Sequence, residues 1–248
     1  MSTAYARIIL LFVLVALWEG FTRLGNVSPI LVAPPTEIVV HIGRIFTGYT
    51  TVPEFYPNLS ITLREIAFAF GLTLGFGLLV GAVVGGLKTV ADAYMPILLV
   101  AFAIPKIIIY PIIFLLMGTE MMPKIVFGFI VGVFAVIFNT AAGIRQVDRN
   151  YITLAHAVGL NKVEIFFKVI LPAAAPTILA GLRLGFGYTI IGVIVGELLV
   201  VNAGLGYLID WAAFQYFTPQ LYALILITLS IGVAGNYVFG IFERMWVK

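Results

Sequence analysis

Three of the ionisable side chains inside the long apolar runs of this 248-residue chain are the first candidates for chemistry. Lys106 lies near the middle of one run, whereas Arg183 and Glu197 share a later one. Asn139 and Thr140 add polarity to the run between them. Because a charge in hydrocarbon is costly, such residues either line a path through the membrane or pair inside the protein. Lys106, Asn139, Arg183 and Glu197 are therefore path candidates, with internal pairing as the open alternative and snorkelling as a further one for Arg183.

The residues that enzymes use for acid–base, nucleophilic or metal chemistry are sparse. Two His and no Cys are present, and the sequence shows no metal-ligand cluster and no nucleophile–base pair. We therefore predict no catalytic residue, no metal site and no cofactor in this chain. The stretch GAVVGGLKT resembles a phosphate-binding loop, but Leu87 intervenes before Lys88. It also ends an apolar run, whereas a phosphate loop follows a strand, so no ATP site is expected here.

The composition places most of the chain in a membrane. Hydrophobic residues make up 62% of it and charged residues 10%, and the mean hydropathy is +1.14. A hydrocarbon core about 30 Å thick takes about 20 apolar residues to cross. The chain has roughly six such runs, at residues 8–24, 61–87, 95–117, 125–144, 173–201 and 221–242. We predict an all-α fold, a polytopic membrane helical bundle of about six transmembrane helices, as one domain over residues 1–248 with a five-helix core at 61–242.

Two features precede that core. The first run, 8–24, could be a secretory signal, but no small-x-small cleavage site follows it, so we interpret it as a retained anchor. Residues 36–47 carry apolar side chains at a helical period in a stretch too short and too polar to span. We predict an amphipathic helix at the membrane surface there.

The distribution of basic residues predicts the orientation. With the amino terminus in the cytoplasm, the inside set is Arg7, Lys88, Arg145, Arg149, Lys162, Lys168, Arg244 and Lys248. The set on or near the outside is smaller and consists of Arg23, Arg44, Arg64 and Lys124. This asymmetry follows the positive-inside rule, so both termini and the polar stretch 148–172 are expected in the cytoplasm.

Small residues recur four apart along the runs. The pairs are Gly71/Gly75, Gly77/Gly81/Gly85, Gly128/Gly132, Gly181/Gly185 and Gly192/Gly196. In lipid, where apolar side chains gain little by leaving the hydrocarbon, such spacings let helix backbones approach closely. We predict close packing within one bundle at most of them.

The longest polar stretch between the later runs, 148–172, reads DRNYITLAHAVGLNKVEIFFKVILP. It has two amphipathic helical stripes separated by Gly159, one of Tyr151, Leu154, Ala155 and Val158 and one of Val163, Phe166, Phe167 and Ile170. Gly159 suits a left-handed residue after a helix end, and Asn161 with Glu164 suits a capping box at the start of the next helix. Pro172 and Pro176 are expected to mark the start of the next span. The pattern predicts two short helices joined by a sharp corner; an ordinary amphipathic loop on lipid headgroups is the alternative.

A short helix ending in Gly159, followed by nine residues and Val169-Ile170-Leu171-Pro172, resembles the cytoplasmic EAA signature of ATP-binding-cassette (ABC) importer permeases. The likeness extends over nearly the whole chain, particularly to permeases for nitrate, sulfonates, taurine and pyrimidine precursors. It includes AIPKIIIYPIIFLLMG, NTAAGIRQVD, GLRLGFGYTIIGVIVGE, GLGYLI and the terminal ERMWVK. One departure is plain, because Thr153 and Leu154 stand where the signature has its acid and first alanine.

The resemblance implies a type I ABC importer permease fold in a bacterial or archaeal cell (inner) membrane. It also implies a coupling helix that docks on a cytoplasmic ABC ATPase dimer, which binds the ATP and Mg²⁺. The expected ATPase-coupling residues are Thr153, Leu154, Ala155, His156, Gly159, Leu171 and Pro172. Further expected partners are a second permease copy, as a homodimer or with a homologue, and an extracytoplasmic solute-binding protein, with no nucleic acid.

Two other classes remain open from the sequence. A secondary transporter should show repeated halves, and no convincing internal repeat is found. A non-transporting membrane scaffold could have the same spans without a cavity. The substrate stays undecided as well, because Lys106 and Arg183 favour an anion such as nitrate or a sulfonate, whereas the many aromatic residues favour a heterocycle.

Overall fold

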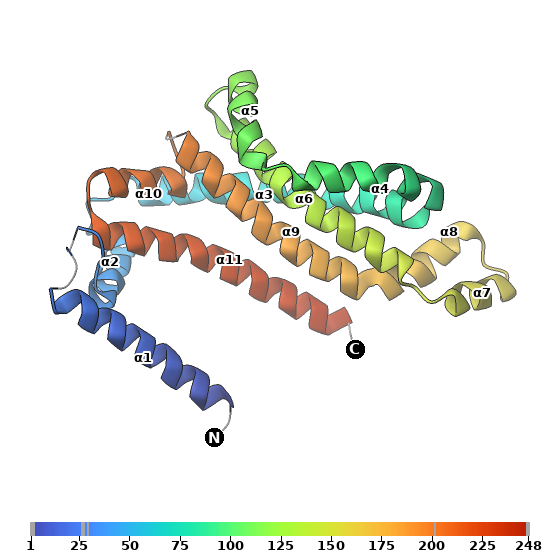
Figure 1. The fold of residues 1–248 in the computed structure, drawn as a ribbon, viewed down its shortest axis with the longest axis horizontal. Coiled ribbons are helices and arrows are strands. Elements are labelled where there is room, and N and C mark those ends of the chain that lie inside the picture. The colour runs from blue at the N-terminus through green and yellow to red at the C-terminus, as the bar shows by residue number, and fades with distance from the viewer. Residues whose placement is uncertain (1–2, 26–27, 29, 201, 247–248) are drawn as a thin grey trace. The chain divides into compact units, whose positions relative to one another are not determined.

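The structure is a computed structural model that describes residues 3–25, 28, 30–200 and 202–246, with side chains described for 5–25, 28, 30–200 and 202–241. Regular secondary structure in these residues is helical (Figure 1). The elements are α1 (Thr3–Arg23), α2 (Pro35–Thr47), α3 (Phe55–Gly86), α4 (Lys88–Ala103), η1 (Lys106–Ile109), α5 (Tyr110–Met117), α6 (Met121–Arg145), α7 (Arg149–Ala157), α8 (Lys162–Ile165), η2 (Phe166–Ile170), α9 (Leu171–Leu199), α10 (Leu205–Phe214) and α11 (Thr218–Trp246).

Five helical segments in the described residues are long and apolar enough to cross a membrane, and a bent pair brings the number up to six. The prediction of an all-α bundle with about six spans is confirmed. The run at 95–117 is divided, however, because α4 and the η1–α5 segment are bent by 82° at Ile104–Pro105. Val201 and Lys248, used above for a span end and a charge count, lie outside the described residues, as do the side chains of Phe242 and Arg244.

The chain forms two compact units: unit 1 holds Met1–Ile61 and Glu197–Ile231, and unit 2 holds Thr62–Gly196 and Gly232–Lys248. In unit 1, α1 is joined to α2 by a carboxylate. Glu19 accepts hydrogen bonds from the Thr36 backbone N–H at 3.0 Å and from the Thr36 hydroxyl at 2.7 Å. It thereby satisfies an otherwise orphaned donor in the first turn of α2. The structure thus has a helix where an amphipathic one was expected; its place at the membrane surface stays a prediction.

Close helix contacts in unit 2 depend on glycine. A Cβ at Gly132 of α6 would lie 2.8 Å from the Gly185 carbonyl oxygen of α9, and one at Gly192 would lie 2.7 Å from the Gly128 Cα. Real Cβ atoms essentially never approach other heavy atoms so closely. The predicted close packing is confirmed at these positions. It is not seen at Gly71, where a Cβ would meet nothing within 4 Å.

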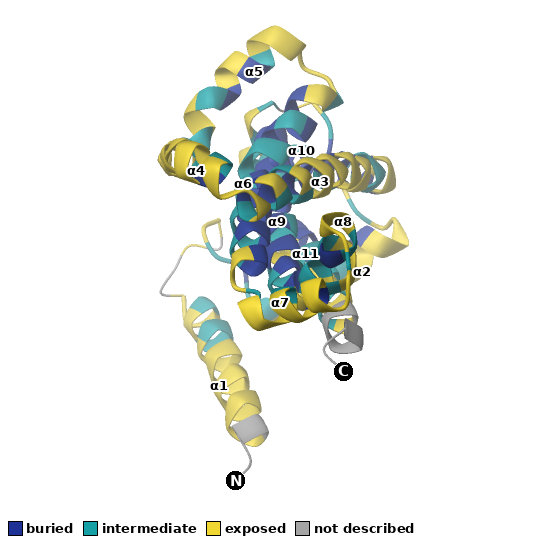
Figure 2. Ribbon diagram, turned by 90° about the vertical axis from the view of Figure 1, so that its right-hand side faces the viewer, coloured by how far each residue is buried: buried dark blue, intermediate teal, exposed yellow. Residues whose placement is uncertain are grey.

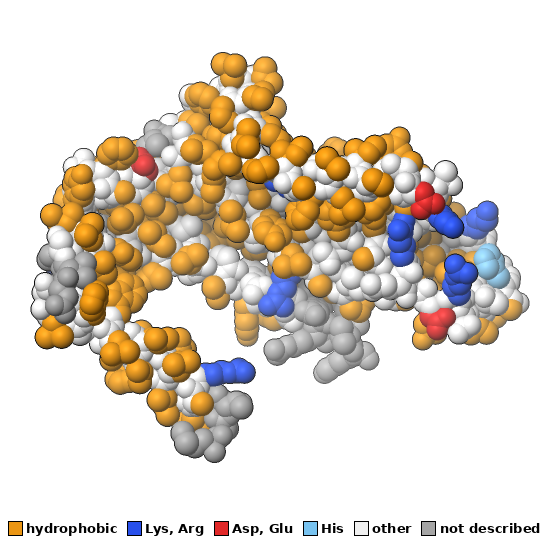
Figure 3. Space-filling view, in the orientation of Figure 1, with side chains coloured by type: hydrophobic (Ala, Val, Ile, Leu, Met, Phe, Trp, Pro, Cys, Tyr) orange, Lys and Arg blue, Asp and Glu red, His pale blue; other side chains and the backbone are white. Residues whose placement is uncertain are grey.

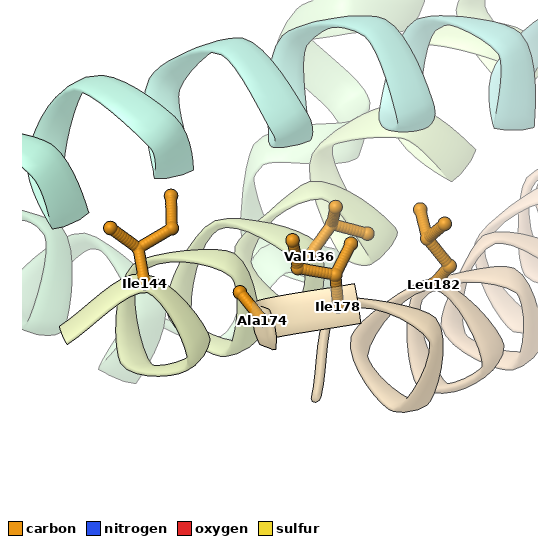
Figure 4. Close-up of a cluster of buried hydrophobic side chains, with 5 residues drawn as sticks. All are labelled: Val136, Ile144, Ala174, Ile178 and Leu182. Atoms are coloured by element: carbon orange, nitrogen blue, oxygen red, sulfur yellow. The ribbon is translucent and has the colours of Figure 1, made fainter. Parts of the chain in front are cut away.

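The apolar core of unit 2 lies between α6 and α9. Figure 2 shows buried residues on both of these helices, and also on other elements such as α10. Figure 4 shows Val136 and Ile144 from α6 meeting Ala174, Ile178 and Leu182 from α9. The same cluster receives partly buried side chains from α3 and from the segment before α9. Because close-packed interiors transmit displacement, α9 is coupled to the elements on both sides of it.

Candidate functional site

The polar stretch 148–172, here called the coupling segment, has the predicted corner. Asp148 caps α7 by accepting the Asn150 backbone N–H at 2.9 Å. Gly159 ends that helix with φ of 84°, a left-handed conformation that costs little only for glycine. Asn161 and Glu164 form the predicted capping box at α8. The helix caps and the left-handed glycine, each decided by neighbouring residues, therefore determine the corner.

Beyond the corner, the structure differs from the expected second short helix. Helix α8 continues through η2, a π-helical turn, directly into α9, so that Lys162–Leu199 forms one helical segment. The Leu171 N–H donates to the Phe166 carbonyl five residues earlier. Pro172, which has no N–H to donate, follows this turn near the start of α9, and Pro176 lies inside α9. The prolines therefore mark an irregular stretch of one helix and not a separate beginning.

The outward face of the coupling segment carries large apolar side chains among exposed polar and charged ones. Its large exposed side chains, here called the exposed apolar set, are Tyr151, Leu154, Val158, Val163 and Phe167. Leu154 is 64% exposed and Val158 75% exposed. His156 is also exposed, whereas the Thr153 hydroxyl donates to the Arg149 carbonyl of its own helix at 3.0 Å. Large apolar side chains in a polar loop are typical of a surface that a partner covers.

One expected coupling residue takes a different position. Ala155 is only 5% exposed, so its side chain packs inside this chain and offers no surface for close approach of a partner. The helical stripe that groups Ala155 with Leu154 and Val158 in the sequence is thus split by the fold. Sequence periodicity gives the angle of a residue around a helix, but the neighbouring elements decide which angles are covered.

The inward face of the coupling segment joins the core. Ile165 is buried, and Phe166, Ile170 and Leu171 pack against the α6–α9 cluster. The expected coupling residue Leu171 therefore connects the segment to the transmembrane core. Helix α8 is thus continuous with α9, and a packed apolar contact joins the segment to the core.

Of the path candidates, Lys106 lies at the break between α4 and α5. Its Nζ donates to the Phe102 carbonyl and lies 4.4 Å from the ring centroid of Phe102 and 5.1 Å from that of Phe134. Asn139 and Arg183 have protein partners as well. Asn139 Nδ2 donates to the Ala135 carbonyl at 2.8 Å, and Arg183 Nε donates to Asn236 Oδ1 on α11.

Glu197, the fourth path candidate, is fully buried and belongs to unit 1. Its Oε2 accepts the Gly206 backbone N–H at 2.7 Å in the first turn of α10. The N-cap residue, Gly204, has φ of 102°, and its N–H donates to Asn58 Oδ1 at 2.7 Å. A carboxylate at a helix amino terminus is stabilised by the free N–H groups and by the helix dipole. The structure therefore gives Glu197 a capping partner, and its place on a path stays a prediction.

We predict that Glu197→Gln lowers the thermal stability of the purified protein by a few degrees, because a neutral amide accepts the Gly206 N–H less strongly and loses the dipole attraction. Thermal unfolding in detergent measures this. Asp210→Asn removes a carboxylate inside α10, away from its first turn, and serves as the control. A stability loss equal in both variants contradicts the capping role.

The sequence analysis missed a buried ion pair in unit 2. Lys124 Nζ on α6 lies 3.7 Å from Glu65 Oε1 on α3, and the two side chains are 1% and 0% exposed. Beside them, the Tyr110 hydroxyl donates to the Gly196 carbonyl at 2.8 Å. The sequence had placed Lys124 on or near the outside, where exposure is the usual expectation. The available signal was the position of Glu65 inside the apolar run 61–87.

The geometry agrees with comparisons to known proteins. Residues 73–248 match the family model described as binding-protein-dependent transport system inner membrane component. A Bacillus subtilis protein named as an aliphatic sulfonates transport permease is 30% identical over 95% of this chain and 84% of its own. A formylaminopyrimidine transport permease protein of Halalkalibacterium halodurans is 29% identical over 90% of this chain and 86% of its own. A nitrate import permease protein of Synechocystis is 30% identical over 84% of this chain and 74% of its own.

Solved structures show the same fold. An inward-facing MetNI methionine ABC transporter chain matches with a TM-score of 0.63 at 17% identity, over 78% of this chain and 94% of that one. A chain of an amino acid ABC transporter matches with a TM-score of 0.61 at 19% identity, over 84% of this chain and 96% of that one. With the helical spans and the family match together, the chain belongs to the binding-protein-dependent transport system inner membrane component family, as a multi-pass, non-catalytic permease subunit of an ABC importer whose ATP hydrolysis belongs to a separate ATPase.

Proposed function

We propose that the coupling segment docks on a cytoplasmic ATPase subunit through its exposed apolar set, and that motion there changes the side from which a solute path opens. The observation that carries this proposal is the two-sided character of the segment. Tyr151, Leu154 and Val158 point away from the chain, whereas Phe166 and Leu171 pack on the α6–α9 core. A docked partner that moves would therefore move α9.

Surface chemistry supports a cytoplasmic partner at this place. In Figure 3 the visible charged side chains of unit 2 gather mainly over its α7–α8 end, whereas the surface of the transmembrane helices is mostly apolar. Burial of apolar surface contributes about 25 cal/mol per Å², so covering several large apolar side chains gives a substantial gain. The positive-inside distribution supports a cytoplasmic position for this end and for both termini.

Because each chain has one coupling segment, an ATPase dimer would take up two permease chains. We propose two permease copies, or one copy and a homologue, on an ATPase dimer that binds the ATP and Mg²⁺, with an extracytoplasmic binding protein that delivers the solute. Closure of the ATPases would bias a two-state bundle, as alternating access requires. The names of the relatives support a small solute such as nitrate, an aliphatic sulfonate or a formylaminopyrimidine, and we propose a solute of this kind, taurine included.

The test is co-purification of the ATPase with the double variant Leu154→Asp, Val158→Asp. We expect the variant to fold and to weaken ATPase binding roughly tenfold or more, because two charges replace apolar contacts that must be desolvated. Asn150→Asp, on the exposed side of the same helix, adds a charge without removing apolar surface and should have a smaller effect. Unchanged ATPase binding by the double variant contradicts the docking proposal, and solute uptake without any ATPase would favour a secondary transporter.

A further inference from the structure

The break between α4 and α5 lies in the middle of a predicted membrane run. Ile104 and Pro105 are extended, with ψ of 128° and 105°, and the flanking helices meet at 82°. Pro105 causes the break because it has no backbone N–H and disfavours helical geometry at the residue before it. Non-helical backbone at membrane depth is tolerated where it lies in protein or lines a water-filled cavity.

The charge at this break has no neutralising carboxylate in the part of the chain whose side chains are described. Among the described residues, Lys106 has no carboxylate within ion-pair distance. Its Nζ donates to the Phe102 carbonyl and faces two aromatic rings. An ammonium group has three N–H donors, so these contacts leave donors for another acceptor. A cation in mid-membrane is costly unless an anion or water meets it.

An open hollow of about 290 Å³, here called the cavity, lies beside this ammonium group, and most of its lining residues are exposed. Its lining residues are Phe102, Ala103, Ile104, Pro105, Lys106, Val131 and Tyr188. All of them belong to unit 2. The charge comes from Lys106 alone, the Tyr188 hydroxyl adds one neutral donor, and the remaining wall is apolar or aromatic. The cavity therefore combines one cation with a surface suited to a small apolar body.

We infer that this cavity is a binding site for the transported solute inside the permease, and that Lys106 makes it selective for solutes with one anionic oxygen group on a small apolar or planar body. The ammonium group binds the anion, and Phe102, Val131 and Pro105 contact the body. The site rests on the proposed function, because the solute path must reach the cavity. It adds a charge filter within the membrane to the selection made by the binding protein.

The aromatic environment explains why one cation is sufficient. Phe102 and Phe134 hold the ammonium group by cation–π contact, so its position is fixed before the anion arrives. Preorganisation of this kind lowers the entropic cost of binding. A hydrogen bond to a charged group contributes about 1.5–3 kcal/mol, which corresponds to roughly 10- to 150-fold in affinity. A neutral isostere should therefore bind far more weakly than the anion.

Direct binding to the purified permease–ATPase complex in nanodiscs tests the inference. The probes are benzenesulfonate and its neutral isostere benzenesulfonamide, measured by equilibrium dialysis without ATP. We expect the wild type to prefer the anion, Lys106→Met to lose roughly tenfold or more of that affinity, and Lys106→Arg to retain most of it. Val131→Phe, which fills the cavity without touching the charge, should lower the binding of both probes.

Equal affinity of Lys106→Met and wild type for benzenesulfonate overturns the inference, as does a wild type that binds neither probe. If Lys106→Met fails to assemble, the Val131→Phe variant decides: unchanged benzenesulfonate binding overturns the site, and lost binding supports it. ATPase association is measured in the same preparations. A site that fails while the ATPase still docks through the coupling segment refutes this inference alone and leaves the proposed function intact.

Discussion

Lys124→Met is expected to abolish the folded, monodisperse protein, whereas the double variant Lys124→Met, Glu65→Gln should recover much of it. The two charged side chains are buried between α3 and α6 with Nζ and Oε1 3.7 Å apart. Removing one partner leaves an uncompensated buried charge, which costs about 3–5 kcal/mol. Neutralising both removes that cost, because replacement of a whole buried pair is often nearly neutral. Yield and thermal unfolding in detergent measure the difference.

The control for this pair is Arg64→Met, which removes a cation at an exposed position directly beside Glu65. Exposed charges contribute little to stability, so the expected shift is small. The prediction is wrong if Lys124→Met is as stable as the wild type, or if the double variant is no better than Lys124→Met alone. Either result would mean that the pair does not interact energetically.

A single methyl group at Gly132 is expected to have an effect of similar size. Gly132→Ala would bring a Cβ within 2.8 Å of the Gly185 carbonyl oxygen, against the backbone of α9. Backbone cannot rotate away as a side chain can, so α6 and α9 must separate. Overpacking of this kind costs about 1–3 kcal/mol, and the loss of neighbouring contacts adds to it. We expect a clear fall in the unfolding temperature and in the recovered complex.

Gly71→Ala is the matched control, and its expected effect on thermal stability has the opposite sign. A Cβ there meets nothing within 4 Å, and alanine favours a helix over glycine by up to about 1 kcal/mol. The variant should be as stable as the wild type or slightly more stable. Equal losses in Gly132→Ala and Gly71→Ala would show that glycine acts through helix propensity or membrane insertion and not through the α6–α9 contact.

The sequence by itself determined the membrane environment, the number of spans and the corner of the coupling segment. These features depend on local quantities: the length of an apolar run, the absence of a side chain at Gly159 and the reach of the Asn161 side chain to the first turn of α8. Each is decided within a few residues by solvation, backbone sterics or a short hydrogen bond. The family likeness followed from the order of such local signals along the chain.

Only the tertiary structure decided which residues each polar or small side chain contacts. Glu65 and Lys124 are 59 positions apart in the sequence, so no periodicity predicts that α3 and α6 bring them together. Ala155 lies on the same helical stripe as Leu154, yet packing covers one and exposes the other. The sequence alone made Lys106 a candidate for an anionic solute, but only the structure showed the bend at Pro105 and the rings of Phe102 and Phe134 around it. Burial and pairing depend on contacts between distant segments, and these form only when the helices pack.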